Sequence, residues 1–138
     1  MRVSRRALLG VVSVAGLWGL GACGPEEDLE PLEALTSDPM ADEQLLDLEL
    51  VSSESRGYRT TMGKPEYAEL THHFQIIDDD VLTRAVTAAE DAGWVGEAPI
   101  NEALRTWRGA KDSPRRTCAI TVTDDGLLLV KLTNLETP

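Results

Sequence analysis

The sequence predicts an α+β fold in which a mainly antiparallel sheet of about four strands carries one main helix on one face. Three observations predict it: an alternating segment at 66–77, an amphipathic segment at 79–92, and two apolar segments that flank a turn at 124–126. A sheet with one apolar face has to bury that face against another layer, and one helix between pairs of strands supplies a layer on one side only. The expected architecture is therefore a small two-layer domain.

The first strand is expected near Gln44, where the ordered part of the chain should begin. Leu46, Leu48 and Leu50 alternate with acidic residues, and this period of two is typical of a half-buried strand. The polar residues at 52–57 are expected to form a loop after it.

A second strand is predicted to begin near Glu66. Its apolar side chains recur at every second residue and so share one face, at Ala68, Leu70, His72, Phe74 and Ile76. His73 points to the other face, so the two histidines of the chain cannot bind one metal ion from a regular strand. We expect His72 to be a hydrogen-bonded core residue and His73 to be exposed.

The main helix is predicted over 79–92, where apolar residues recur at helical spacing from Val81 to Ala92. The three aspartates at 78–80 open it, and their carboxylates are expected to cap the free N–H groups of the first turn. They lack the spaced oxygens and the central glycine of a calcium-binding loop. Gly93 is expected to end the helix in the left-handed conformation, with Trp94 packed back onto the last turn.

The last two strands flank the turn at 124–126, and their residue pattern predicts the register. A three-residue loop places Val122 opposite Leu128 and Cys118 opposite Leu132, which gathers apolar side chains on one face. A two-residue loop would mix polar and apolar residues on both faces. The glycine of the turn then occupies the left-handed position of a type I turn with a bulge. Cys118 is expected to be buried and unreactive.

The segment at 99–108 fits two structures. Ile100, Leu104 and Trp107 follow Pro99 at helical spacing, so we expect a helix, with a short edge strand as the alternative. Trp94 and Trp107 could form an aromatic platform for a sugar, but we expect both to pack in the core.

The first 22 residues have the layout of a signal peptide. Arg5 and Arg6 lie in a positively charged start, and an apolar run over 7–22 ends in small residues. That run is shorter than the roughly 20 residues of a spanning helix, so an uncleaved anchor is the less favoured alternative. The Leu-Gly-Ala-Cys sequence ending at Cys23 resembles the lipobox of bacterial lipoproteins. The resemblance implies cleavage between Ala22 and Cys23 and a diacylglyceryl group on the Cys23 sulfur.

The arginine pair before two leucines also resembles a twin-arginine export motif, with the general secretory route as the alternative. The segment 1–23 resembles the lipoprotein precursors of high-GC Gram-positive bacteria. The later stretches DPMA, GKPEYAEL and AAEDAGW resemble small uncharacterised lipoproteins of that group. This resemblance implies lipid attachment on the outer face of the cytoplasmic membrane, and it implies no particular activity.

The expected mature chain is strongly acidic. The whole chain has a formal charge of −11; three of its 13 basic residues precede Cys23 and all 24 acidic residues follow it, so 23–138 carries −14. This charge excludes nucleic acid as a partner, because phosphates are bound mainly by Lys and Arg. It also opposes direct binding to an anionic leaflet. We expect a lipidated, flexible acidic tether over 23–43 and a single folded domain over 44–138.

Five bases within 105–116 form a candidate partner-binding patch, namely Arg105, Arg108, Lys111, Arg115 and Arg116. No catalytic motif, metal-ligand set or cofactor motif is evident. The sequence therefore favours a non-enzymatic binding or accessory module of the cell envelope, whose partner is an envelope protein or an anionic wall polymer. The alternative is a small-ligand carrier or an enzyme with a shallow site near His72.

Overall fold

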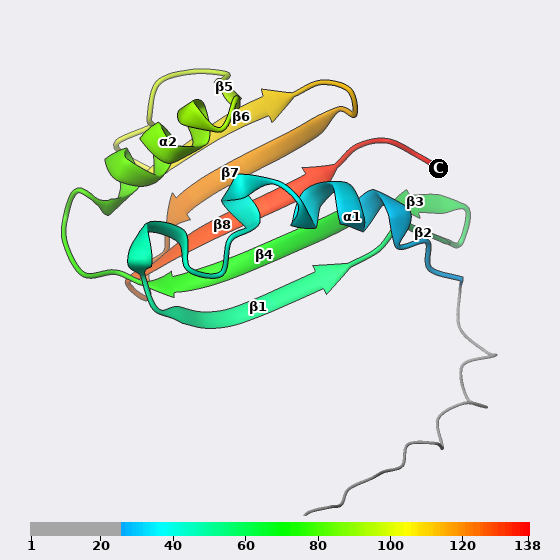
Figure 1. The fold of residues 1–138 in the computed structure, drawn as a ribbon, viewed down its shortest axis with the longest axis horizontal. Helices are drawn as coiled ribbons and strands as arrows, with labels where there is room; N and C mark the ends of the chain where they lie inside the picture. Colours follow the sequence, from blue (N-terminus) through cyan, green and yellow to red (C-terminus); the bar gives the residue numbers. More distant parts are fainter. Residues whose placement is uncertain (1–25) are drawn as a thin grey trace, which may run out of the picture.

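The computed structural model describes residues 26–138, which build a six-stranded antiparallel sheet with helices on one face (Figure 1). The strand order is β1-β4-β8-β7-β6-β5. The strands are β1 (Leu50–Arg56), β4 (Ala68–Gln75), β5 (Val95–Gly96), β6 (Thr106–Lys111), β7 (Arg116–Val122) and β8 (Leu127–Asn134). The predicted α+β class and the mainly antiparallel sheet are confirmed, but the sheet has six strands rather than about four.

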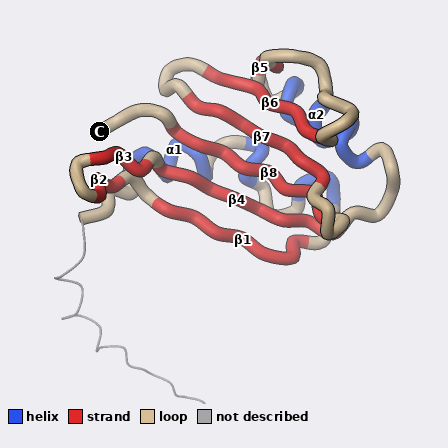
Figure 2. Tube along the Cα trace, turned by 180° about the vertical axis from the view of Figure 1, so that it is seen from behind, coloured by secondary structure: helices blue, strands red, loops and turns tan. Residues whose placement is uncertain are grey.

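A separate two-stranded hairpin connects β1 to β4. It consists of β2 (Arg59–Thr61) and β3 (Lys64–Glu66), and the sequence did not predict it. The hairpin projects from the end of the main sheet at which β1 ends and β4 begins (Figures 1 and 2).

Two helices divide the covered face of the sheet between them. Helix α1 (Glu30–Thr36) contacts β4 and β8, whereas helix α2 (Val81–Asp91) contacts β6 and β7. The short 3-10 turn η2 (Pro39–Ala41) contacts α2 and β8. Figure 2 shows the sheet from behind, where no described helix lies over the strands. The fold is therefore a two-layer arrangement with one uncovered sheet face.

Helix α2 confirms the predicted main helix and its end. Its buried residues lie on one stripe: Val81, Ala85, Val86 and Ala89. Gly93 has a φ of +97°, and its N–H donates to the Glu90 carbonyl at 3.0 Å. The Trp94 N–H donates to the Ala89 carbonyl, also at 3.0 Å. These two bonds are those of a Schellman motif, which satisfies the last carbonyls of the helix.

The predicted capping of α2 by carboxylates is wrong in its detail. Asp80 occupies the N-cap position but its side chain accepts no capping hydrogen bond. Instead, Arg84 Nη2 lies 2.8 Å from Asp78 Oδ2, and Arg84 Nε lies 3.3 Å from Asp80 Oδ1. Arg84 thus pairs with two of the three aspartates at the start of the helix.

The C-terminal hairpin has the predicted register. Val122 pairs with Leu128 and Cys118 pairs with Leu132. Gly126 has a φ of +81°, and its N–H donates to the Thr123 carbonyl at 3.0 Å. Burial alternates along both strands, so the apolar face predicted from the pattern is the face that meets the helices.

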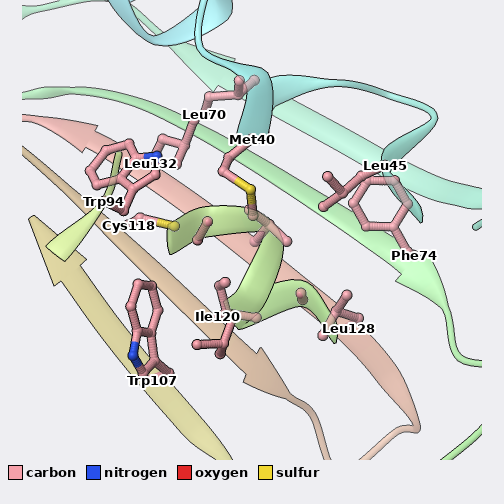
Figure 3. Close-up of a cluster of buried hydrophobic side chains, with 14 of the residues drawn as sticks. Met40, Leu45, Leu70, Phe74, Trp94, Trp107, Cys118, Ile120, Leu128 and Leu132 are labelled. Atoms are coloured by element: carbon pink, nitrogen blue, oxygen red, sulfur yellow. The ribbon is translucent and has the colours of Figure 1, made fainter. Parts of the chain in front are cut away.

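The tether predicted over 23–43 is wrong from Glu30 onward, because this part of the chain is folded onto the sheet. Leu35 is fully buried and Met40 is 1% exposed. Figure 3 shows Met40 and Leu45 of this segment among the labelled core side chains of β4, β7 and β8. Apart from the buried Asp38, the acidic residues of the segment are exposed, while its apolar residues complete the core. The folded region therefore begins well before Gln44.

The strand predicted over 46–50 is also wrong, as is the loop predicted over 52–57. Leu46 and Asp47 have φ values of +54° and +60°, so the chain turns there and forms the 3-10 turn η3 (Leu45–Asp47). The strand begins only at Leu50 and includes the polar residues assigned to the loop. Strand β1 is an edge strand with exposed residues on both sides, which is why it shows no apolar alternation.

The helix expected over 99–108 is absent, and the alternative strand is closer to the structure. Thr106–Lys111 form β6, in which Trp107 and Gly109 point into the core. A Cβ atom on Gly109 would overlap the indole ring of Trp107. The indole therefore lies flat across Gly109, and that close approach requires a strand with glycine two residues after the tryptophan.

The predicted signal peptide over 1–22, with Arg5 and Arg6, and the lipidation site at Cys23 lie outside the described residues. Within 26–138, no helix is long and apolar enough to cross a membrane.

Substitution of Gly126 by valine should lower the free energy of unfolding by more than about 1 kcal/mol, because a β-branched residue resists positive φ. Nothing lies within 4 Å of the added Cβ position, so the loss is conformational rather than steric. Chemical denaturation of the Gly126→Val and Gly126→Asn variants measures it. Asparagine tolerates the left-handed region and should cost much less; equal stability of the valine variant and the wild type would contradict the turn assignment.

Candidate functional site

The five bases of the predicted patch do not form one surface. Arg105 and Arg115 are exposed in the loops before β6 and β7, and Arg108 is exposed on the uncovered face of the sheet. Lys111 and Arg116 point to the covered side, where their side chains are only 16% and 14% exposed. Neighbouring residues on a strand face opposite sides, so a run of bases along a strand is divided between two faces.

Lys111 and Arg116 are held by a buried carboxylate that the sequence did not single out. The Asp38 side chain is 2% exposed, and its Oδ2 accepts a hydrogen bond from Lys111 Nζ at 2.6 Å and lies 3.8 Å from Arg116 Nη1. Its Oδ1 accepts from the Trp94 indole N–H at 3.1 Å and from the Met40 backbone N–H at 2.9 Å. Both oxygens are thus satisfied, as a buried charge requires.

The Trp94 ring contacts the same two cations. Lys111 Nζ lies 4.9 Å from the ring centre, and the Arg116 guanidinium carbon lies 5.7 Å from it. These separations are within the range of cation–π attraction. Trp94 is only 2% exposed, so it cannot serve as a platform for a sugar. We refer to Asp38, Trp94, Lys111 and Arg116 as the Asp38 cluster, and its contacts are structural: it joins the N-terminal segment to the end of α2 and to β6 and β7.

The uncovered sheet face is the largest functional candidate in the described part of the chain. The register places alternate residues of five strands on it. They are Ser52, Glu54 and Arg56 of β1; Glu69, Thr71 and His73 of β4; Leu127, Leu129, Lys131 and Thr133 of β8; Thr117, Ala119 and Thr121 of β7; and Thr106, Arg108 and Ala110 of β6. We call this set the open face. Strands about 4.8 Å apart give it an area of roughly 24 Å by 20 Å.

The open face is polar and more positive than the rest of the protein. It carries three cations, Arg56, Arg108 and Lys131, and two acids, Glu54 and Glu69. Lys131 Nζ lies 3.2 Å from Glu69 Oε2. An excess of one positive charge contrasts with the formal charge of −11 of the whole chain. A surface of this size and polarity resembles the smaller class of protein–protein interfaces rather than a small-molecule site.

Hydroxyl and imidazole groups are ordered across one end of the open face. Thr106 Oγ1 and Thr121 Oγ1 are 2.7 Å apart, and Ser52 Oγ lies 3.2 Å from His73 Nδ1. Register places Leu129 between these two pairs. His73 is half-buried rather than fully exposed as expected. The polar groups of this row are held by contacts between neighbouring strands.

His72 points into the core and offers no chemistry at the surface. It is 3% exposed, its ring meets Phe74 edge-on at a centroid distance of 5.8 Å, and no residue of 26–138 hydrogen-bonds it. Burial lowers the pKa of His72 below 6.5, and the carboxylates of Glu43 and Asp42 oppose this shift only in part. The stability contributed by the neutral buried ring is present above about pH 6.5 and is lost as the pH falls through the lowered pKa.

No cluster of three or more His, Cys, Asp or Glu residues within 26–138 could hold a metal ion. A hollow of about 730 Å³ lies between α2 and the segment 94–100, with Glu90 and Val95 among its lining residues. His72 does not line it. This hollow is therefore separate from the shallow site expected near His72, which stays a prediction.

Comparison with known proteins gives no match among family models, curated proteins or solved structures.

Asp38→Ala should lower the free energy of unfolding by about 3–5 kcal/mol, because it leaves two cations and an indole N–H without their buried acceptor. Asp42→Ala is the matched control: Asp42 also accepts from the backbone N–H two residues on, at 2.8 Å, but it is exposed. That variant should lose only about 1 kcal/mol. Chemical denaturation measures both.

A double-mutant cycle of Asp38→Asn with Lys111→Met isolates the ionic contact. The cycle should give a coupling free energy of at least about 1 kcal/mol. If the losses of unfolding free energy in the two single variants simply add up in the double variant, the contact between Asp38 and Lys111 does not stabilise the fold.

The Cys118 thiol should react slowly in the folded protein. The side chain is fully buried, and burial together with the charge of Asp38 raises its pKa to about 12, so roughly one thiol in 10,000 is ionised at pH 8. Labelling of a Cys23→Ser chain, whose single thiol is Cys118, by a thiol-specific reagent should be at least a hundredfold slower without denaturant than with it. Equal rates would contradict the burial of Cys118.

Proposed function

We propose that the protein is a lipid-anchored binding module on the outer face of the cytoplasmic membrane, and that it holds an envelope protein on its open face. The anchor rests on the sequence around Cys23, which resembles a lipobox. The observation that carries the binding role is the six-stranded sheet with helices on one face and an open, ordered polar surface on the other. The module performs no reaction of its own.

A protein partner fits the charges of the open face better than a wall polymer. Glu54 and Glu69 are on the same face as Arg108 and Lys131, and they would repel a uniformly anionic polymer. A protein surface can place a base against each acid and an acid against each base. Of the five bases in the segment 105–116, only Arg108 lies on this surface, since Lys111 and Arg116 are held by Asp38 on the covered side.

A small-ligand carrier is the second candidate, favoured by the hollow beside α2. Its volume of about 730 Å³ lies within the usual range of ligand pockets. Glu90 is the one charged residue that lines it, so a cationic or neutral ligand would fit. The hollow lies on the covered side of the sheet, which makes the two candidates separable by mutation of the open face.

Cross-linking in the native host, followed by purification of the lipidated protein and mass spectrometry, tests the proposal. The open-face variant Arg108→Glu/Lys131→Glu should lose the cross-linked partner, because it reverses two of the three cations of the face. The matched control is Arg105→Glu/Arg115→Glu, which changes the net charge equally at exposed loop positions. It should retain the partner.

Retention of the partner by the open-face variant would contradict the assigned surface, and capture of wall polymer alone would contradict a protein partner. Cys23→Ala should abolish the lipid and remove the protein from the membrane fraction. Unchanged membrane retention of that variant would contradict the lipid anchor.

A further inference from the structure

The β2–β3 hairpin ends in a two-residue turn, Met62–Gly63, with an unusual first residue. Met62 has a φ of +53° and Gly63 a φ of +80°, the backbone of a type I′ turn. Asn, Asp and Gly favour the first position of that turn, whereas a larger side chain is strained at positive φ. The Met62 side chain is moreover 95% exposed.

The domain gains nothing visible from Met62. Its side chain packs on no core residue, and the hairpin would turn with less strain if asparagine stood there. Other large apolar residues are exposed in the described region, but none of them is exposed to this degree. A strained residue that presents an apolar side chain to solvent indicates a contact with something outside the domain.

The chain that leads to Cys23 starts beside this hairpin. Asp28 and Tyr58 form an antiparallel bridge, with N–H to carbonyl distances of 2.7 and 2.8 Å. The bridge is antiparallel. The chain followed backwards from Asp28 to Glu26 therefore has the same direction as the chain followed forwards from Tyr58 to the hairpin tip. Glu26 and Glu27 accordingly share a surface hollow with Arg59 and Thr60 of β2.

Covalent reach places the anchor close to the tip of the hairpin. Cys23 precedes Glu26 by three residues, so its Cα lies no more than about 11 Å from that of Glu26. The tip at Met62 lies four residues beyond Tyr58, at most about 14 Å along the strand. An acyl group on Cys23 is therefore within reach of a membrane surface that lies level with the hairpin tip.

The charge of the tip suits an anionic leaflet, unlike that of the surrounding chain. Lys64 is exposed beside the turn, while Arg59 is paired with Glu66. A lysine near an anionic surface is attracted to it. Glu26 and Glu27 oppose a closer approach of the neighbouring chain, so contact is confined to the tip.

We infer that the β2–β3 hairpin is a membrane-contact loop, which inserts Met62 among the lipid headgroups and fixes the orientation of the anchored domain. The inference rests on the proposed lipidation of Cys23. One methionine and one lysine would not hold a soluble protein at a membrane, but the lipid already supplies a high local concentration. The contact only has to favour one orientation, with the β7–β8 turn at the far end of the sheet directed away from the bilayer.

Site-specific fluorescence on the lipidated protein in vesicles with anionic lipid tests the inference. Met62→Cys and Asp125→Cys each place one reactive thiol in the exposed turn of a hairpin, because Cys23 is acylated and Cys118 is buried. An environment-sensitive label at position 62 should shift to the blue and be quenched several-fold more by lipid-borne quenchers than the same label at 125. Equal quenching at the two positions would overturn the inference.

Energy transfer reports the orientation without a label at the tip. In Asp125→Cys protein, transfer from the label to an acceptor in the membrane should rise at least twofold when Met62→Ser is added. Val95→Ser, which removes an apolar side chain that is 71% exposed elsewhere, should leave the transfer unchanged. No change with Met62→Ser would also overturn the inference.

Mass spectrometry of the same samples separates this inference from the proposed function. A lipidated protein that floats with vesicles but keeps position 62 in water would refute the contact loop and leave the anchor intact. A protein without lipid on Cys23 would refute the anchor and the contact loop together.

Discussion

The arrangement of the covered face depends on the contacts of one buried carboxylate, Asp38. It accepts hydrogen bonds from Trp94 and Lys111, which lie 56 and 73 residues further along the chain. These contacts attach the N-terminal segment to the end of α2 and to the strands beneath it. Buried ion pairs add little net stability over a well-packed apolar contact, but they tolerate few alternative arrangements, because an unpaired buried charge is costly. Asp38 therefore determines where the segment lies more than how tightly it is held.

That position decides which face of the sheet remains free. Once α1 and η2 complete the layer begun by α2, the apolar face of β4, β7 and β8 is buried, as Leu35 and Met40 show. The opposite face then has no described element left to cover it. Its residues are accordingly polar and cross-paired, a composition that water tolerates and that a protein partner can recognise. The open face is thus a consequence of α1 and η2 packing on the other face of the sheet.

The sequence predicted those elements whose structure is set by local periodicity. The register of the β7–β8 hairpin was correct down to the Cys118–Leu132 pair, because a shift of one residue would have exposed every apolar side chain. Strand β1 was missed because an exposed edge strand need not alternate. The N-terminal segment was missed because its acids and prolines dominate its composition, while its buried Leu35 and Met40 are supported by partners far away in the chain. The acidic composition of such a segment reflects its exposed residues and does not reveal which of its apolar residues are buried.

The prediction of the candidate site was limited in the same way, because distant contacts could not be read from the sequence. Five bases that are near one another in sequence were expected to form a single patch, and they do not. Strand pleating sends Lys111 to the covered side and Arg108 to the open face, where it lies in a row with Lys131 of β8 through the register Arg108–Ala119–Lys131. Lys131 is 23 residues away from Arg108 in the chain and was never grouped with it. A charged surface on a sheet is defined by register across strands, so it becomes visible only when pairing is known for several strands. In this chain the sequence predicted one of those pairings, β7 with β8, and missed the pairing of β6 with β7 because Trp107 was expected in a helix.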